Sequence, residues 1–321
     1  MILPARADFP LPGHPVLTVL ICLVCLGVFM QQQGDWTDFE LAMDSYCTSP
    51  RSRIDEMVLQ RVDELRGAEF CGQAMYEIDN SGNPDEDIEQ LVSSLKPLTG
   101  LSREDSLGYT RQILHDELRL YRSFVPEDPD TKYAYETSSW NPLHMLTASF
   151  AHADWGHIIF NLIFFFAFAA TVEAIVGPVA FIIFVLLISI VIGVTDSVVS
   201  TLADKHHWTL GLSGVVTGMM GMFAYLLPHG RIRVYYWFLI IFGSVAVPGW
   251  ILALWYIGGD VYQLFTYDEH GGINVLAHVT GGVVGYFYGF FFLRKARQRA
   301  VNVQHGLGLA NYPDDIPSSA Q

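Results

Sequence analysis

Long uninterrupted stretches of apolar residues constrain this chain more than any other feature. Five of them follow one another from Trp155 onward: Trp155–Val176, Val179–Leu202, Leu210–Leu227, Val234–Ile257 and Ile273–Leu293. Each is close to the ~20 residues that a helix needs to cross a bilayer core of about 30 Å. Hydrophobic residues make up 51% of the chain and charged residues only 16%. The sequence therefore predicts an all-α polytopic membrane protein rather than a soluble domain.

A shorter apolar run, Val16–Met30, lies near the start of the chain. It is either a signal peptide, whose removal leaves five spans, or a retained first span. The retained span is favoured because the glutamines at 31–33 do not form a cleavage site and Arg6 is the only basic residue before the run. Six membrane-spanning helices then place both termini on the same side of the membrane.

Basic residues near the ends of the spans predict the orientation. On the side shared by the termini are Arg6, Arg231, Arg233, Arg294, Lys295, Arg297 and Arg299. Lys205 alone lies in the short loops on the opposite side. Because basic residues concentrate in cytoplasmic loops, we expect an integral, multi-pass protein with both termini in the cytoplasm.

Most of the net charge lies between the first and second spans. Residues 35–136 contain 23 acidic and 10 basic residues, a net charge of −13 out of −15 for the whole chain. Such a balance argues against nucleic acid as a partner. Apolar residues recur at helical spacing in three stretches of this region, which predicts a small α-helical insert on the outer face. We expect four parts: 1–33 with the first span, the acidic insert 34–140, a core 141–293 with five spans, and a basic segment with a disordered tail, 294–321. The partner of the insert is not identified by the sequence.

The insert contains two features whose interpretation stays open. The acidic stretch Glu77–Asp85 is similar to a calcium-binding loop, but Ile88 occupies the position of the bidentate Glu, which favours a solvated acidic turn. Cys47 and Cys71 lie in a compartment where disulfides persist. A helix between them would hold them ~30 Å apart, so a bridge requires the helix to break near Gly67. The sequence leaves bridged and free thiols equally open.

Polar side chains within the spans are candidates for function, because each costs about 2.5–3.5 kcal/mol to insert. His157 and Asn161, four residues apart, lie on one face of the second span and can donate to one oxygen. Alternatively, they merely form hydrogen bonds between helices. No metal site is expected, since His152 and His157 are five residues apart and Ala153 stands where a zinc protease needs Glu.

Two further spans carry a serine and a histidine beside ridges of small residues. Ser213 begins a span within Gly211-Leu212-Ser213-Gly214, and small residues continue at Gly218 and Gly221. In the last span His278 is followed by Gly281, Gly285 and Gly289. Two such ridges allow close helix packing, which would bring Ser213 next to His278 as a minimal activated nucleophile. Either residue alone is more often a packing or polar contact.

Taken together and in this order, these motifs resemble the rhomboid family of intramembrane serine proteases. The resemblance covers about Leu146–Leu293 and the first span, and it leaves the insert unexplained. It implies a six-helix bundle in which Ser213 is the nucleophile and His278 the base of a dyad that has no third, acidic member. It also implies an oxyanion hole of His157, Asn161 and the Ser213 backbone N–H.

The same resemblance implies structural roles for His152 and Glu173, no cofactor, transmembrane proteins as substrates, and a bacterial inner (plasma) membrane as the location. Thr217 departs from the family pattern, because many bacterial relatives have a Tyr there that packs against the base. The loop Asp260–Gly272 is expected to act as a lid over the site. Two alternatives are a rhomboid-like protein that binds membrane proteins without cutting them and, from Glu173 and Asp196, a transporter.

Overall fold

The computed structural model describes residues 2–9, 14–238, 241–266 and 274–304. The chain divides into two compact units, which are described separately below. Unit 1 consists of Met1–Gln32 with Asp130–Gln321, and unit 2 of Gln33–Pro129. The four-part division predicted from the sequence stays a prediction; unit 2 ends at Pro129, whereas the insert was expected to extend to residue 140.

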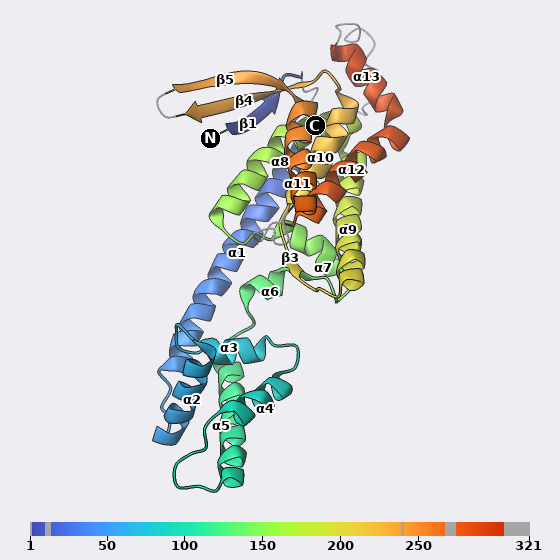
Figure 1. The fold of residues 1–321 in the computed structure, drawn as a ribbon. Coiled ribbons are helices and arrows are strands. Elements are labelled where there is room, and N and C mark those ends of the chain that lie inside the picture. The colour runs from blue at the N-terminus through green and yellow to red at the C-terminus, as the bar shows by residue number, and fades with distance from the viewer. Residues whose placement is uncertain (1, 10–13, 239–240, 267–273, 305–321) are drawn as a thin grey trace. The chain divides into compact units, whose positions relative to one another are not determined.

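Unit 1 is built mainly of helices that lie side by side (Figure 1). They are α1 (Val16–Cys47, shared with unit 2), α8 (Trp155–Val176), α9 (Pro178–Ala203), α10 (Ser213–Leu226), α11 (Gly249–Thr266), α12 (Val275–Phe292) and α13 (Arg294–Gln304). Within the described residues, α1, α8, α9 and α12 are long and apolar enough to cross a membrane, and α10 is a shorter apolar helix. The prediction of a polytopic helical membrane protein is confirmed.

The prediction of one helix over Val234–Ile257 is wrong. That segment contains most of a β-hairpin, β4 (Arg231–Phe238) paired antiparallel with β5 (Ile241–Pro248), and only then enters α11. A third strand, β1 (Ile2–Ala7), pairs with β4 to complete the sheet order β1-β4-β5. The physical reason is that β4 is rich in aromatic and β-branched residues, which favour strands, and apolar content alone does not distinguish a strand from a helix.

The sheet β1-β4-β5 and helix α13 lie at the same end of unit 1 (Figure 1, top). These elements contain the seven basic residues that the sequence assigns to one side of the membrane. Glu173, near the end of α8, accepts hydrogen bonds at the start of α1 from the backbone of Leu17 and Thr18 (3.0 and 2.8 Å) and from the Thr18 hydroxyl (2.7 Å). These hydrogen bonds hold the start of α1 against the end of α8.

The segment that leads into α8 folds against α9. It consists of α6 (Pro129–Tyr133), β2 (Tyr135–Glu136), α7 (Pro142–Thr147) and the 3₁₀ turn η1 (Ala148–Phe150). Strand β2 pairs with β3 (Trp208–Thr209), which immediately precedes the Ser213 region. The Ser149 hydroxyl donates to Ser189 on α9 (3.0 Å), and Met145 packs directly over Gly193. These contacts fix the chain just before α8 to the helix that precedes α10.

Helix α10 lies at the centre of unit 1 and packs against α8, α9, α11 and α12. Twelve of its 14 residues are buried. Aromatic side chains fill the space around it: Phe168 on α8 meets Phe223 on α10 edge to face, with ring centroids 5.4 Å apart. A serine at the first residue of this helix is therefore held by the most completely packed element of the unit.

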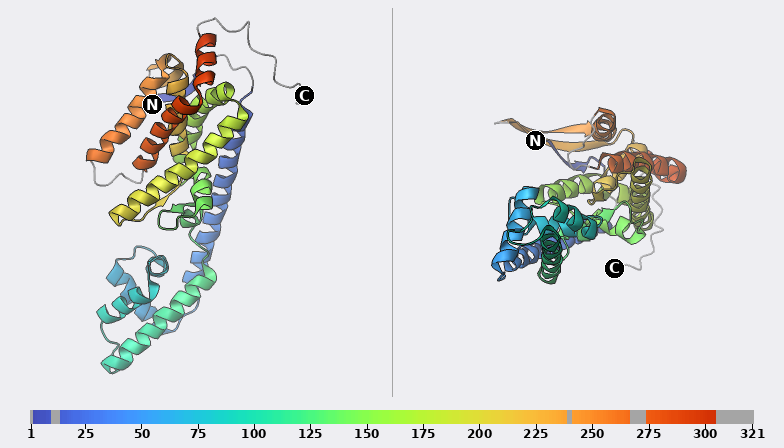
Figure 2. Two further views of the ribbon diagram at one scale, coloured as in Figure 1. Left: turned by 90° about the vertical axis from the view of Figure 1, so that its right-hand side faces the viewer. Right: turned by 60° about the horizontal axis from the view of Figure 1, so that its bottom comes forward.

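Unit 2 is a small helical domain, as Figure 2 shows from two sides. Its helices are α2 (Arg53–Arg66), α3 (Gln73–Asp79), α4 (Pro84–Ser94) and α5 (Arg103–Phe124). The stretches predicted to be helical from their apolar spacing, Ile54–Leu65, Ile88–Leu95 and Leu107–Tyr121, overlap α2, α4 and α5, and α3 is additional. Each helix contributes to one core through a buried side chain: Val58, Ile78, Ile88 and Leu114.

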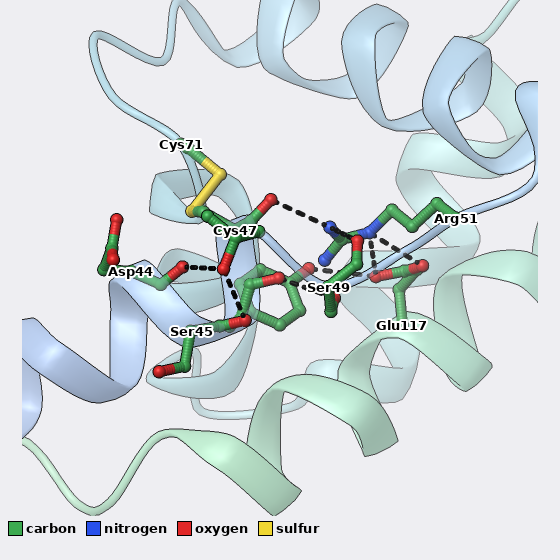
Figure 3. The surroundings of a disulfide bond; sticks show 9 residues. Asp44, Ser45, Cys47, Ser49, Arg51, Cys71 and Glu117 are labelled. Atoms are coloured by element: carbon green, nitrogen blue, oxygen red, sulfur yellow. Dashed lines mark hydrogen bonds and ion pairs between the residues drawn. A yellow bond between two sulfur atoms is a disulfide. The ribbon is translucent and has the colours of Figure 1, made fainter.

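A disulfide joins Cys47, the last residue of α1, to Cys71 (Figure 3). Their Cα atoms are 6.1 Å apart. The bridge is possible because α2 ends at Arg66 and Gly67 takes a left-handed conformation (φ +67°), so the chain doubles back. Beside it, the buried side chains of Arg51 and Glu117 pair at 3.1 Å. Of the two states that the sequence left open for Cys47 and Cys71, the structure has the disulfide.

Acidic residues at the end of α3 and the start of α4 make ion pairs. Arg66 pairs with Glu77 and Asp87, and Arg122 pairs with Asp79. Over the described residues, no three His, Cys, Asp or Glu side chains gather closely enough to hold a metal ion.

Candidate active site

Helices α10 and α12 cross with their backbones in contact. A Cβ placed on Gly285 would lie 2.0 Å from the carbonyl oxygen of Gly218, and one on Gly281 would lie 2.1 Å from that of Gly214. Side chains at these positions would push the two helices apart. The close approach of two glycine ridges, predicted from the sequence, is confirmed by these distances.

This crossing brings the first turns of the two helices together. Ser213 is the first residue of α10, and His278 lies in the first turn of α12. Their chain neighbours touch, since a Cβ on Gly214 would lie 3.3 Å from the carbonyl oxygen of Ala277. Within the described residues no hydrogen bond joins the Ser213 hydroxyl to the His278 ring. Ser213 and His278 therefore lie on adjoining backbone segments without a hydrogen bond between their side chains.

His157 and Asn161 on α8 lie against the chain that leads to Ser213. A Cβ on Gly211 would lie 2.8 Å from Cε1 and Nε2 of His157 and 3.8 Å from Nδ2 of Asn161. Gly211 also has φ +118°, so both its conformation and its surroundings require glycine. Asn161 is 7% exposed, and its buried Nδ2 has no hydrogen-bond partner among the described residues. Its amide donor is free to bind an oxygen.

His278 has a partner that the sequence analysis missed. Its Nδ1 lies 3.0 Å from Oδ2 of Asp260, and both side chains are mostly buried. The predicted start of the lid loop Asp260–Gly272 is wrong, because α11 continues to Thr266. Residues 267–273 lie outside the described part, so the lid stays a prediction. The sequence did contain a signal for this contact, because Asp260 is an ionisable residue within an apolar segment and such a residue needs a polar partner.

The start of α12 is held by a second carboxylate. The Asn274 side chain caps the helix by accepting from the Ala277 backbone N–H (2.9 Å), and its amide donates to Asp196 (2.5 Å) and Thr209 (2.9 Å). Asp196 is fully buried within α9. This cap fixes the backbone of the turn that contains His278.

Of the other predicted site residues, His152 lies near these groups, whereas Glu173 lies near the opposite end of α8. His152 is 1% exposed, its backbone N–H donates to Gln32, and its ring meets that of His157 edge to face at 5.1 Å. The Thr217 hydroxyl donates to the Gly214 carbonyl of its own helix (2.9 Å). His152 thus supports His157, whereas Thr217 makes no hydrogen bond to His278. The structural roles of His152 and Glu173 stay predictions, which their contacts support.

A bundle of apolar helices, with a serine and a histidine at one helix crossing and the unpartnered amide of Asn161 on α8, defines an integral, multi-pass membrane protein with a polar site. Residues 139–295, which contain all of these groups, match the family model described as Rhomboid domain. The chain therefore contains a rhomboid domain, and members of the rhomboid family are in general intramembrane serine proteases acting on transmembrane substrates. A search of curated proteins finds no match.

Proposed function

We propose that this chain is an intramembrane serine endopeptidase that cuts transmembrane segments of membrane proteins near the outer face. The observation that carries the proposal is the crossing of α10 and α12, which brings Ser213 and His278 onto touching backbone segments. A serine hydroxyl is a weak nucleophile until a base takes its proton. The imidazole ring of His278, in the first turn of the neighbouring helix, can accept this proton.

The proposed reaction has two halves. Nε2 of His278 takes the proton of the Ser213 hydroxyl while Oγ attacks the peptide carbonyl carbon, and the ring then gives this proton to the leaving amine as the C–N bond breaks. The product is an ester on Ser213. Water hydrolyses the ester with the same base, so the serine is regenerated.

The negative oxygen of each tetrahedral intermediate needs donors that are already in place. Asn161 offers a buried amide without a described partner, and His157 lies beside it against Gly211. Ser213 begins a helix, so its backbone N–H is one of the donors that have no partner within the helix. In soluble serine proteases one such donor contributes about 2.7–4 kcal/mol to transition-state stabilisation.

The same proposal includes an orientation with both termini cytoplasmic and the insert outside, in a bacterial inner (plasma) membrane. The gathering of basic segments at one end of unit 1 supports it. The Cys47–Cys71 bridge supports it too, because disulfides persist in extracytoplasmic compartments.

Incubating the purified protein in detergent with a single-pass membrane protein tests the activity. Wild type should release two fragments whose termini, read by mass spectrometry, lie within or beside the transmembrane segment. Ser213→Ala should release none while keeping the wild-type elution volume and thermal midpoint. Binding of the substrate without cleavage by wild type would instead favour the non-proteolytic alternative.

A further inference from the structure

Asp260 is the only charged residue of α11 (Gly249–Thr266). It lies toward α12, where its carboxylate meets Nδ1 of His278 at 3.0 Å, and the residue is 8% exposed. One turn earlier on α11, Ile257 packs against Gly282, one turn after His278 on α12. Two successive contacts of antiparallel helices thus keep the carboxylate beside the ring.

An aspartate in an apolar helix is costly to insert unless it is paired. The partner available to Asp260 among the described contacts is the ring proposed as the base. An ionised carboxylate only accepts hydrogen bonds, so the pairing requires a proton on Nδ1. In a neutral ring this leaves Nε2 without a proton and able to take one from Ser213.

We propose that Asp260 is a positioning residue that completes a Ser213–His278–Asp260 triad in this chain. It fixes the ring orientation and the tautomer of His278, and its charge stabilises the imidazolium formed when the ring takes the Ser213 proton. This inference rests on the proposed function. It also gives the base a fixed partner in a chain where position 217 is Thr, whose hydroxyl bonds to its own helix.

Asp260→Asn is the decisive variant, because it keeps the size of the side chain but lets the amide donate to Nδ1 and favour the wrong tautomer. We expect kcat to fall by about 10²–10⁴-fold, as for the equivalent change in soluble triads, with KM within about threefold of wild type. Labelling of Ser213 by a fluorophosphonate, in which an Oγ–P bond forms and fluoride leaves, should slow by a similar factor.

Asp204→Asn is the matched control, since Asp204 is exposed at the end of α9 with φ +51°, which Asn tolerates. It should leave kcat and labelling unchanged. Asp260→Glu, which retains the carboxylate, should recover part of the labelling rate. Rates are expressed per mole of monodisperse protein, so that a loss of folded material is not counted as a loss of catalysis.

The outcomes separate the two proposals. If wild type cuts, Ser213→Ala does not, and Asp260→Asn retains kcat within about threefold, the triad is wrong and the dyad stands. If Asp260→Asn and Asp260→Glu lose monodispersity but the remaining protein labels at the wild-type rate, the role is structural and the triad is again wrong. If wild type neither cuts nor labels, the proposed function fails and the triad with it.

Discussion

Replacing Gly285 with alanine tests whether α10 and α12 really touch through their backbones. The new Cβ would lie 2.0 Å from the Gly218 carbonyl oxygen, 1.4 Å short of the 3.4 Å at which ordinary contact begins. The obstacle is backbone, so no side-chain rotation can relieve it. Overpacking of this kind costs about 1–3 kcal/mol of folding free energy.

Gly259→Ala on α11 is the matched control, because a Cβ there meets nothing within 4 Å. Both changes gain the same helix propensity, up to about 1 kcal/mol. The difference between the two variants therefore isolates the cost of the crossing.

The same displacement should reduce activity more than stability. A shift of ~1 Å between a nucleophile and its base costs about a hundredfold in rate. Thermal unfolding in detergent and kcat on a single-pass substrate measure the two effects. If Gly285→Ala is as stable and as active as Gly259→Ala, the helices do not cross as described and the reasoning about Ser213 and His278 is refuted.

Three further predictions follow from the site and the insert. Ser213→Ala and His278→Ala should each abolish cleavage, and the double variant should be no less active than either, since the two act as a unit; an additive loss would contradict this. Asn161→Ala should lower kcat by about 10²–10³-fold and change KM little; a change in KM alone would make Asn161 a substrate-binding residue. Cys47→Ser should destabilise the insert by about 3–4 kcal/mol for a 24-residue separation, with Cys71→Ser as its equal and no further loss in the double variant. Free labelling of Cys47 and Cys71 themselves in the wild type would contradict the bridge, since Cys22 and Cys25 are free in any case.

Hydropathy was sufficient to find most of the membrane helices. The predicted run Trp155–Val176 coincides with α8, and Val179–Leu202 differs from α9 by one residue at each end. Such helices satisfy their own backbone hydrogen bonds, so their position depends mainly on local composition. The small residues also predicted the crossing of α10 and α12, because only glycine permits it.

Contacts between segments far apart in the chain could not be predicted from the sequence. The hairpin β4-β5 is apolar enough to be taken for a span, and its partner β1 comes from more than 220 residues away. The contact of Asp260 with His278 depends on where α11 ends and how it faces α12, and neither is encoded in a local pattern. The disulfide likewise depends on the helix ending at Gly67. The sequence indicated this break as a condition for the bridge but did not establish it.

The central claim is that Ser213 is a nucleophile activated by His278. Exposing the purified protein to a fluorophosphonate and mapping the adduct by mass spectrometry tests it most directly. The account predicts one phosphonylated residue, Ser213, in wild type and in Asp204→Asn, and no adduct in Ser213→Ala or His278→Ala. An unlabelled wild type, an adduct on another residue, or a His278→Ala protein labelled at the wild-type rate would contradict it.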